Sequence, residues 1–302
     1  MIVAITGGTG FVGQALVDLA GQRGVKLRSL ARKIPADPRG VEWEPGDLQD
    51  TDALARLARG AEAVIHIAGQ VQARDVSEFE AANVTGTLNV IEATLAARVP
   101  RFVFVSSLAA REPELSAYGA SKARAEKLVM ASPLDWSIVR PPAVYGPRDG
   151  EMLDLFKMAN RGIVPMPSEG HASMIHVGDL ARFLLAVLPS GEETTGRIFE
   201  PDDGKEGGWE HRELARAIGW AVGKRPMVPR LSRGMLDLAA KMDGVLRGDR
   251  AKLTPDRVGY MCHPDWVSSD EAKPPKSLWK AKVPTREGLK ATARWYRDNG
   301  WL

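Results

Sequence analysis

The sequence contains a single cysteine, Cys262, among its 302 residues. One cysteine excludes a disulfide within the chain and provides no thiolate cluster for a metal. No apolar run reaches the roughly 20 residues that a membrane-spanning helix needs. The first residues also lack the basic region and the small-residue cleavage site of a secretion signal. These absences predict a cytoplasmic protein without a membrane span.

The sequence also has little excess of charge of one sign. The 41 Lys and Arg residues nearly balance the 38 Asp and Glu residues, which leaves a formal net charge of +3. Because no long basic run is present, a nucleic-acid partner is not expected. His171 and His176 have no carboxylate at a helical spacing that would complete a zinc site, so no metal is expected either.

Glycine, in contrast, is concentrated near the start of the chain, where short β-branched runs begin to alternate with helical patterns. The expected strands are residues 2–6, 26–31, 63–68, 101–106 and 136–140, and the expected helices are residues 11–23, 51–58 (capped by Asp50 or Thr51), 77–97 and 121–131. This order predicts an α/β fold with a parallel sheet and helices on both faces.

The motif of Gly7, Gly10 and Gly13 joins the first expected strand to the first expected helix. A helix N-terminus carries unpaired N–H groups and a partial positive charge, which suit a diphosphate. Glycine here permits a tight turn, a close approach of phosphates to the backbone, and close packing of helix on strand. The pattern therefore favours a dinucleotide site over a purely structural turn.

The end of the second strand indicates which dinucleotide is bound. An acid there would bind the adenosine 2′-hydroxyl and select NAD. This position is Ala31, followed by Arg32 and Lys33. The missing acid and the added cations favour NADP over NAD, although both cations could instead be solvated at a strand end.

Tyr118 and Lys122 are four residues apart and share one face of a helix. A nearby cation favours the phenolate form of tyrosine, so Tyr118 could exchange a proton with an alcohol or ketone. Ser107 ends the run RFVFVSS, at the sheet edge where open α/β sheets bind ligands, and could bind the substrate oxygen. The spacing alone is common by chance, and it is the combination that indicates a dehydrogenase site.

Several segments of the chain resemble the extended short-chain dehydrogenase/reductase family, also called the NAD(P)-dependent epimerase/dehydratase family. In order along the chain they are TGGTGFVG, GDL, IHIAG, NVTGTLNVIEA, FVFVSS, YGASK and RPPAVYGPRD. The resemblance covers residues 2 to about 180 and, more loosely, the end of the chain. It implies catalytic roles for Ser107, Tyr118 and Lys122, and it implies that Asn83 ties its helix to neighbouring backbone. The cofactor-binding residues expected from the glycine pattern and the resemblance are Gly7, Thr9, Gly10, Phe11, Val12, Gly13, Arg32, Asp47, Leu48, Ala68, Gly69, Lys122, Pro141 and Val144.

The implied fold is a Rossmann-type doubly wound parallel sheet with a smaller, irregular C-terminal substrate-binding region. After about residue 145, Pro- and Gly-rich connections replace the regular alternation. We expect residues 1–150 to form the dinucleotide-binding domain, with residues 171–200 returning to it. Residues 151–170 and 201–302 then form the substrate-binding domain.

The implied activity is that of an NAD(P)-dependent oxidoreductase or epimerase, with hydride transfer at a secondary alcohol or ketone carbon and Tyr118 as the acid/base. The substrate would be a small molecule, either a nucleotide sugar or an apolar ketone or alcohol. The alternative is a catalytically silent NADP(H)-binding sensor or scaffold. Two features depart from the family pattern: the interval from Ser107 to Tyr118 is short, and the acid of the second strand is missing. Family members often form homodimers, and the sequence leaves this open.

Overall fold

We describe the fold from a computed structural model of the protein, which covers residues 2–73, 75–248, 251 and 253–302. The chain forms two compact units. The first contains Met1–Pro141, Gly178–Pro201 and Ala272–Trp279, and the second contains Pro142–Val177, Asp202–Glu271 and Lys280–Leu302.

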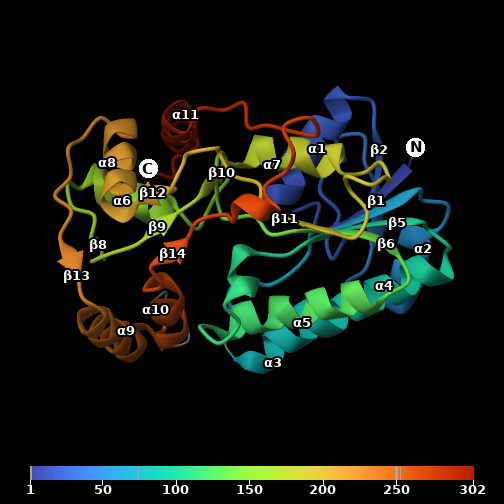
Figure 1. Ribbon diagram of the computed structural model, residues 1–302, viewed down its shortest axis with the longest axis horizontal. Helices are drawn as coiled ribbons and strands as arrows, with labels where there is room; N and C mark the ends of the chain where they lie inside the picture. Colours follow the sequence, from blue (N-terminus) through green and yellow to red (C-terminus); the bar gives the residue numbers. More distant parts are fainter. Residues whose placement is uncertain (1, 74, 249–250, 252) are drawn as a thin grey trace. The chain divides into compact units, whose positions relative to one another are not determined.

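A seven-stranded parallel sheet forms the centre of the first unit in the described part of the chain (Figure 1). Its strands, in spatial order, are β11 (Arg197–Phe199), β6 (Asp135–Val139), β5 (Arg101–Val105), β4 (Ala63–His66), β1 (Ile2–Thr6), β2 (Lys26–Ala31) and β3 (Glu42–Pro45). The chain winds in opposite directions from β1, toward β2 on one side and β4 on the other. Ligands of open α/β sheets bind at such a reversal, outside the carboxyl ends of the strands.

Helices cover both faces of this sheet. They are α1 (Phe11–Gln22), α2 (Thr51–Ala58), α3 (Val76–Phe79), α4 (Gly86–Ala96), α5 (Ala117–Ala131) and α7 (Val177–Ala186). In Figure 1, α4 and α5 lie along one face of the sheet, and α1 and α7 lie along the other. The prediction of a doubly wound parallel α/β sheet is confirmed.

The core explains the apolar runs of the central strands. β4 and β5 are buried along their whole length, which is why nearly every position in them is apolar. Phe102 and Phe104 of β5 pack with Val90 and Ile91 of α4 and with Val129 of α5.

Capping side chains determine where two of the helices begin. The Asp50 carboxylate accepts a hydrogen bond from Ala53 N at 2.9 Å, so Asp50 rather than Thr51 caps α2. Ser116 Oγ accepts from Gly119 N at 2.9 Å, so α5 begins four residues before the expected boundary. The helix therefore includes Tyr118 as well as Lys122.

The chain returns to the large sheet later than the sequence predicts. Residues 171–177 belong to the second unit, where β10 (Met174–His176) pairs with β7 (Ala143–Tyr145) rather than with the large sheet. The return consists of most of α7 and of β11, which pairs with β6 at the sheet edge. The local pattern predicted a strand followed by a helix correctly, but a strand's partner depends on contacts distant in sequence.

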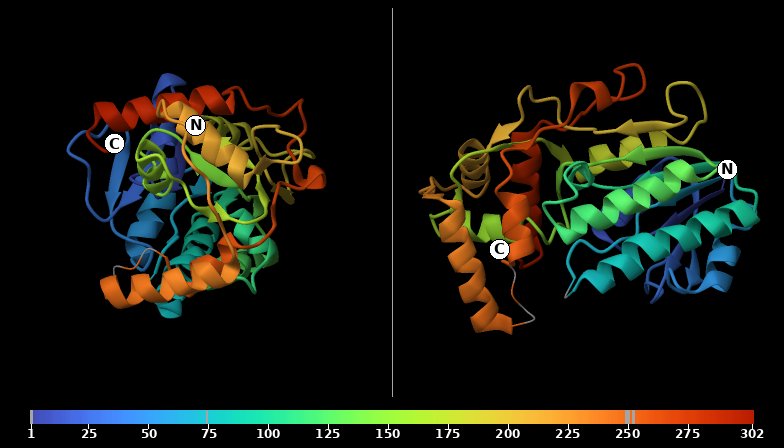
Figure 2. Two further views of the ribbon diagram at one scale, coloured as in Figure 1. Left: turned by 90° about the vertical axis from the view of Figure 1, so that its left-hand side faces the viewer. Right: turned by 60° about the horizontal axis from the view of Figure 1, so that its bottom comes forward.

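The second unit is built from short strands and helices around its own core. Its further elements are α6 (Leu153–Asn160), β8 (Met166–Pro167), β9 (His171–Ala172), β12 (Trp209–Glu210), α8 (His211–Ala221), β13 (Arg230–Leu231), α9 (Arg233–Arg247), α10 (Pro255–Met261), β14 (Asp265–Trp266) and α11 (Thr285–Asp298). Phe156 and Tyr296 lie at the centre of the core, with ring centroids 5.1 Å apart. In the left-hand view of Figure 2, α9 is the orange helix at the lower edge.

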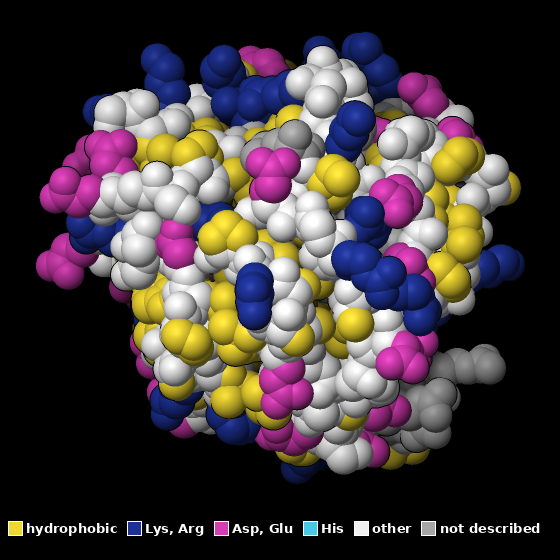
Figure 3. Space-filling model, turned by 90° about the vertical axis from the view of Figure 1, so that its right-hand side faces the viewer, with side chains coloured by type: hydrophobic (Ala, Val, Ile, Leu, Met, Phe, Trp, Pro, Cys, Tyr) yellow, Lys and Arg dark blue, Asp and Glu magenta, His cyan; other side chains and the backbone are white. Residues whose placement is uncertain are grey.

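The surface carries charges of both signs. On the face shown in Figure 3, Lys and Arg side chains are interspersed with Asp, Glu and hydrophobic side chains. Within the described residues, no helix has both the length and the apolar character needed to cross a membrane.

Candidate functional site

The glycine-rich turn joins the carboxyl end of β1 to α1. Gly7 has φ +79°, a conformation that glycine adopts readily. A Cβ atom on Gly7 would lie 2.7 Å from the backbone nitrogen of Ala68, and one on Gly13 would lie 2.0 Å from the Gly7 carbonyl oxygen. Both close approaches require glycine. The first brings the loops after β1 and β4 together at the sheet edge, and the second packs α1 against the turn that precedes it.

The N-terminus of α1 has the character of an anion site. Gly10 caps the helix without any side-chain hydrogen bond, and the first turn contains no acidic residue. The N–H groups of Phe11, Val12 and Gly13 have no acceptor within the helix, because the carbonyl groups four residues earlier lie before the helix begins. Partial positive charge and N–H donors at this terminus therefore fit a diphosphate. Thr9, beside them, is exposed.

A buried chain of hydrogen bonds lies beneath the loop that follows β4. His66 is fully buried; its Nδ1 lies 2.6 Å from Thr6 Oγ1 and its Nε2 lies 3.0 Å from Thr87 Oγ1. The Thr87 hydroxyl donates to the Asn83 carbonyl oxygen at 2.6 Å, so its oxygen accepts the proton of His66 Nε2. Nδ1 then accepts from the Thr6 hydroxyl, whose oxygen accepts from Ala68 N at 3.1 Å.

These donor and acceptor roles leave His66 as the neutral tautomer that is protonated on Nε2. Burial lowers the pKa of His66 from its usual 6.5 to about 3, and the nearby Lys122 ammonium adds to this effect. The imidazole therefore connects β1, β4 and α4 as a neutral group at physiological pH.

Asn83 lies in a π-helical segment, Glu80–Thr85, between α3 and α4. Its Oδ1 accepts from Gln70 N at 2.7 Å, and its Nδ2 donates to Gln70 O at 3.0 Å and to Ser121 Oγ at 2.9 Å. Ser121 Oγ donates in turn to the Tyr118 carbonyl oxygen at 2.7 Å. The expectation that Asn83 ties its helix to neighbouring backbone is confirmed, and the same side chain also reaches α5.

Lys122 is buried one helical turn after Tyr118 on α5. Its side chain donates to the Val105 carbonyl oxygen at 2.8 Å, and Nζ lies 4.5 Å from the centroid of the Phe104 ring. Burial lowers the pKa of Lys122 from 10.5 to about 8, against an opposing effect of the Glu126 carboxylate. At neutral pH the group is therefore still mostly an ammonium ion.

Ser107 follows β5 and caps a short 3₁₀ helix, Leu108–Arg111. The Ser107 Oγ accepts from Ala109 N at 3.2 Å. This 3₁₀ helix packs on the start of α5, because a Cβ atom on Gly119 would lie 2.6 Å from the Ala109 carbonyl oxygen. Ser107 and Tyr118 thus lie on adjoining elements, and one short turn spans the shortened interval between them.

Gly69 and Pro141 also border this edge of the sheet. A Cβ atom on Gly69 would lie 3.5 Å from Lys122 Nζ. The buried Pro141 accepts a hydrogen bond from Leu108 N at 3.0 Å through its carbonyl oxygen. Val144, in contrast, belongs to β7 of the second unit.

Three of the expected cofactor-binding residues, Arg32, Asp47 and Leu48, lie after β2 and β3. Arg32 is exposed just beyond the end of β2. Asp47 is exposed and accepts from Gln49 N at 2.8 Å. Leu48 packs against the core, and its carbonyl oxygen accepts from Asn89 Nδ2 at 2.8 Å.

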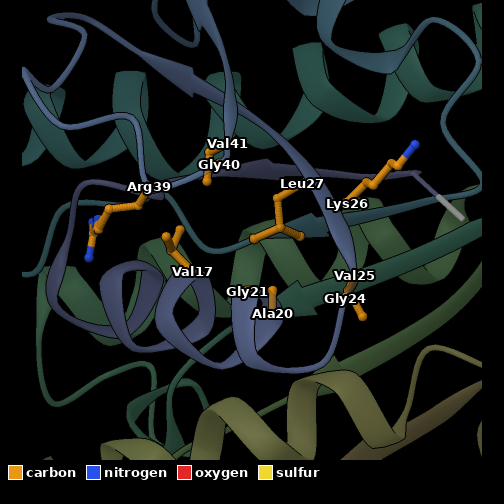
Figure 4. A pocket seen from close by; sticks show the side chains of 10 residues that line it. All are labelled: Val17, Ala20, Gly21, Gly24, Val25, Lys26, Leu27, Arg39, Gly40 and Val41. Atoms are coloured by element: carbon orange, nitrogen blue, oxygen red, sulfur yellow. The ribbon is translucent and has the colours of Figure 1, made fainter.

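A hollow of about 250 Å³ lies beside α1, lined by Val17, Ala20, Gly21, Gly24, Val25, Lys26, Leu27, Arg39, Gly40 and Val41 (Figure 4). Gly24 and Lys26 lead into β2, so the hollow lies at the amino ends of the strands. The expected site residues lie at the opposite, carboxyl edge. None of them lines the hollow.

The histidines of HASMIHVGD do not form a metal centre. His176 packs edge-on against Tyr145, with ring centroids 5.3 Å apart and an interplanar angle of 76°. Among the residues that the structure covers, no group of three or more His, Cys, Asp or Glu side chains is arranged to hold a metal ion.

A sequence profile of the NAD dependent epimerase/dehydratase family matches residues 3–200. The chain belongs to this family. The resemblance carried by the motifs is therefore confirmed, and the chain is an enzyme of the NAD(P)-dependent oxidoreductase/epimerase type.

Three relatives indicate the range of the family around this chain. The ceramide reductase of Caulobacter vibrioides is 39% identical over 310 residues, covering 100% of this chain and 96% of that protein. The 2-alkyl-3-oxoalkanoate reductase of Stenotrophomonas maltophilia is 28% identical over 313 residues, covering 90% and 93%. The UDP-glucose 4-epimerase of Thermus thermophilus, solved in complex with NAD, superposes with a TM-score of 0.73 at 25% identity, covering 98% and 99%.

Sequence reasoning did not identify the series of hydrogen bonds that joins Thr6, His66 and Thr87. One signal was present in AVIHIA, where a histidine interrupts an otherwise apolar buried strand. A polar side chain in such a strand must find hydrogen-bond partners, and the structure places those partners 60 and 21 residues away.

Proposed function

We propose that this family member is an NADP(H)-preferring reductase that interconverts a ketone and a secondary alcohol on an apolar, ceramide-like lipid. The observation that carries the proposal is the grouping of Tyr118, the buried Lys122 and Ser107 at the sheet edge that also holds the glycine-rich turn. The 39% identity to a ceramide reductase over the whole chain supports the choice of substrate class.

The dinucleotide would be held by residues of the sheet edge. The Gly7–Gly13 turn and the first turn of α1 (Thr9, Gly10, Phe11, Val12) would hold its diphosphate. Asp47 and Leu48 would contact the adenine, and Ala68 and Gly69 would contact the adenosine ribose. Pro141 and Val144 would contact the nicotinamide. Arg32 would bind the 2′-phosphate, which supports the NADP preference. When bound, this cofactor supplies or accepts the hydride.

The proton would be moved by the chain's own residues. In the direction of reduction, the Tyr118 hydroxyl donates its proton to the substrate oxygen as the ketone becomes an alcohol. Because Ser107 Oγ already accepts from Ala109 N, its hydroxyl proton can be donated to the same substrate oxygen. The Lys122 ammonium stabilises the phenolate that Tyr118 leaves behind.

The part of the second unit that is built around Phe156 and Tyr296, and that excludes α9 and α10, would bind the alkyl part of the substrate. This core is rich in Met, Leu and Trp side chains, and the substrate of an enzyme depends on such local features rather than on its fold. The two reductases named above both act, by name, on molecules other than nucleotide sugars.

The test is cofactor oxidation with candidate substrates. Purified protein is mixed with NADPH or NADH and with either a detergent-solubilised keto analogue of ceramide or a UDP-sugar, and the loss of reduced-nicotinamide absorbance is followed. We expect turnover of the keto lipid with NADPH. Tyr118→Phe should slow it by about 100-fold or more, the typical contribution of a general acid, and should leave cofactor binding intact.

Thr94→Val is the matched control, because it also removes one hydroxyl group and Thr94 lies near the end of α4 in the first unit. The control should retain the wild-type rate. Retention of the wild-type rate by Tyr118→Phe would refute the assigned acid. Turnover of the UDP-sugar but not of the keto lipid would refute the substrate class.

A further inference from the structure

Helix α9 exposes a continuous row of large apolar side chains, which we call the α9 stripe. Its members are Met235, Leu238, Met242, Val245 and Leu246, which are 54%, 61%, 56%, 88% and 78% exposed. At spacings of three and four residues they fall on one side of the helix. On another side, Leu236 and Ala240 are buried against Val258 of α10. The helix is therefore apolar on two sides, and the described residues cover only one of them.

Single exposed apolar residues are ordinary on soluble proteins, whereas a contiguous apolar patch marks an interaction surface. The α9 stripe follows the whole helix, from its first turn to its last. A helix of 15 residues is about 22 Å long at 1.5 Å per residue.

The charges of α9 favour an anionic partner. Arg233 and Lys241 are exposed, whereas Asp237 is only partly exposed. The Asp243 side chain is only 16% exposed and pairs with Arg247 at 3.2 Å, while the Arg247 side chain is 56% exposed. The fully exposed charges on the helix are therefore positive, and its two carboxylates are only partly exposed.

We propose that α9 docks the protein on an anionic lipid membrane. The α9 stripe enters the boundary between headgroups and acyl chains, and Lys241, three residues after Leu238 and four before Val245, lies among the lipid phosphates. An amphipathic helix with a cation beside its apolar side binds such a surface through both apolar burial and charge attraction. The choice of a membrane as partner rests on the proposed function, because an enzyme acting on a ceramide-like lipid must meet that lipid at a membrane surface.

The test is flotation of the full-length protein with vesicles, measured without turnover. One vesicle preparation is phosphatidylcholine alone, and the other is an equimolar mixture of phosphatidylcholine and phosphatidylglycerol. We expect the wild type to float with the anionic vesicles and at least tenfold less with the neutral ones. Leu238→Glu/Val245→Glu should lose at least tenfold of the anionic binding.

Leu88→Glu/Leu95→Glu is the matched control, because both residues are exposed leucines, 38% and 37%, on α4 of the first unit. This variant should float like the wild type. Melting curves report whether each variant folds, and Leu238→Ser/Val245→Ser repeats the test if the glutamates lower the melting temperature.

Three results would overturn the proposal. The first is a wild type that does not float, and the second is a stripe variant that floats as well as the wild type. The third is a wild-type dimer, seen by light scattering, that the stripe variant converts to a monomer, because the stripe would then be covered by a second copy of this chain.

The proposed function can fail separately. In detergent, the stripe variant should reduce the keto lipid at the wild-type rate, whereas Tyr118→Phe should bind vesicles normally without reducing it. Vesicle binding without turnover of any keto lipid would refute the reductase and support the docking surface. Turnover of the keto lipid without vesicle binding would support the reductase and refute the docking surface.

Discussion

The hydrogen bonds of Thr87 lead to a stringent prediction. Its hydroxyl accepts from His66 Nε2 at 3.0 Å and donates to the Asn83 carbonyl oxygen at 2.6 Å, and the side chain is 1% exposed. Thr87→Val preserves the shape of the side chain and removes both bonds. In the tautomer that Thr87 sets, the imidazole N–H of His66 is then buried without an acceptor, and a change of tautomer would instead take away Nδ1 as the acceptor of the Thr6 hydroxyl.

The expected loss of stability follows from these two bonds. A buried donor left without an acceptor costs about 1–3 kcal/mol, and an ordinary hydrogen bond contributes about 0.5–1.5 kcal/mol. We therefore expect Thr87→Val to lower the free energy of unfolding by about 2–4 kcal/mol. Dinucleotide affinity should fall as well, because the same chain ends on the Ala68 N–H beside Gly7.

The same helix provides a matched control. Thr94 is fully buried, and its hydroxyl donates to the Val90 carbonyl oxygen at 2.6 Å, the same bond to the preceding turn. Within the described residues no side chain is bonded to this hydroxyl, so Thr94→Val should lose only about 0.5–1.5 kcal/mol. Urea denaturation gives both free energies, and titration of fluorescence with NADPH gives both affinities. Equal losses for the two variants would show that His66 does not depend on Thr87.

The remaining predictions concern charge and close packing. Because the folded-state pKa of His66 is about 3 instead of 6.5, the unfolded chain binds more protons between these values. The contribution of His66 to the free energy of unfolding should therefore fall below pH 6.5, by up to about 1.4 kcal/mol per pH unit. Burial raises the pKa of Asp149 to about 7, which changes stability in the opposite direction, so urea denaturation at a series of pH values compares the wild type with His66→Gln. A difference between the two that stays constant from pH 6.5 to 4 would contradict a buried neutral imidazole. The folded-state pKa of Lys122 is about 8 instead of 10.5, so its buried charge destabilises the fold below pH 8, and this cost disappears as pH rises to 10.5. Lys122→Met should accordingly raise the melting temperature at pH 7 while abolishing turnover, and a lower melting temperature would disprove this reasoning. Gly13→Ala should prevent dinucleotide binding, because its Cβ would lie 2.0 Å from a carbonyl oxygen. Gly21→Ala in the same helix meets no atom within 4 Å and should stabilise the folded protein by up to about 1 kcal/mol. Calorimetric titration with NADPH and melting curves compare the two variants.

The sequence predicted the parts of the site that local geometry determines. The turn from Gly7 to Gly13 needs glycine for steric reasons, and such reasons leave a recognisable pattern. Tyr118 and Lys122 share a helix face by spacing alone. Their chemical roles remain predictions.

Other parts depend on contacts that are distant in sequence. β3 was not predicted, because glutamates alternate with other residues at this half-exposed edge (Glu42, Trp43, Glu44, Pro45). The partner of β10 could not be inferred, because pairing with β7 joins segments about 30 residues apart. A π-helical segment changes the hydrogen bonding of a helix without altering its apolar residues, so the expected helix 77–97 concealed it.

That π-helical segment has a consequence for how the family varies. A π turn accommodates one residue more than an α turn, so the apolar faces of α3 and α4 are out of phase with each other across Glu80–Thr85. Deleting one residue there would restore a regular helix and rotate the Asn83 amide away from Gln70 and Ser121. Relatives that keep this amide contact must therefore also keep the extra residue, and insertions or deletions should be confined to the segments outside it.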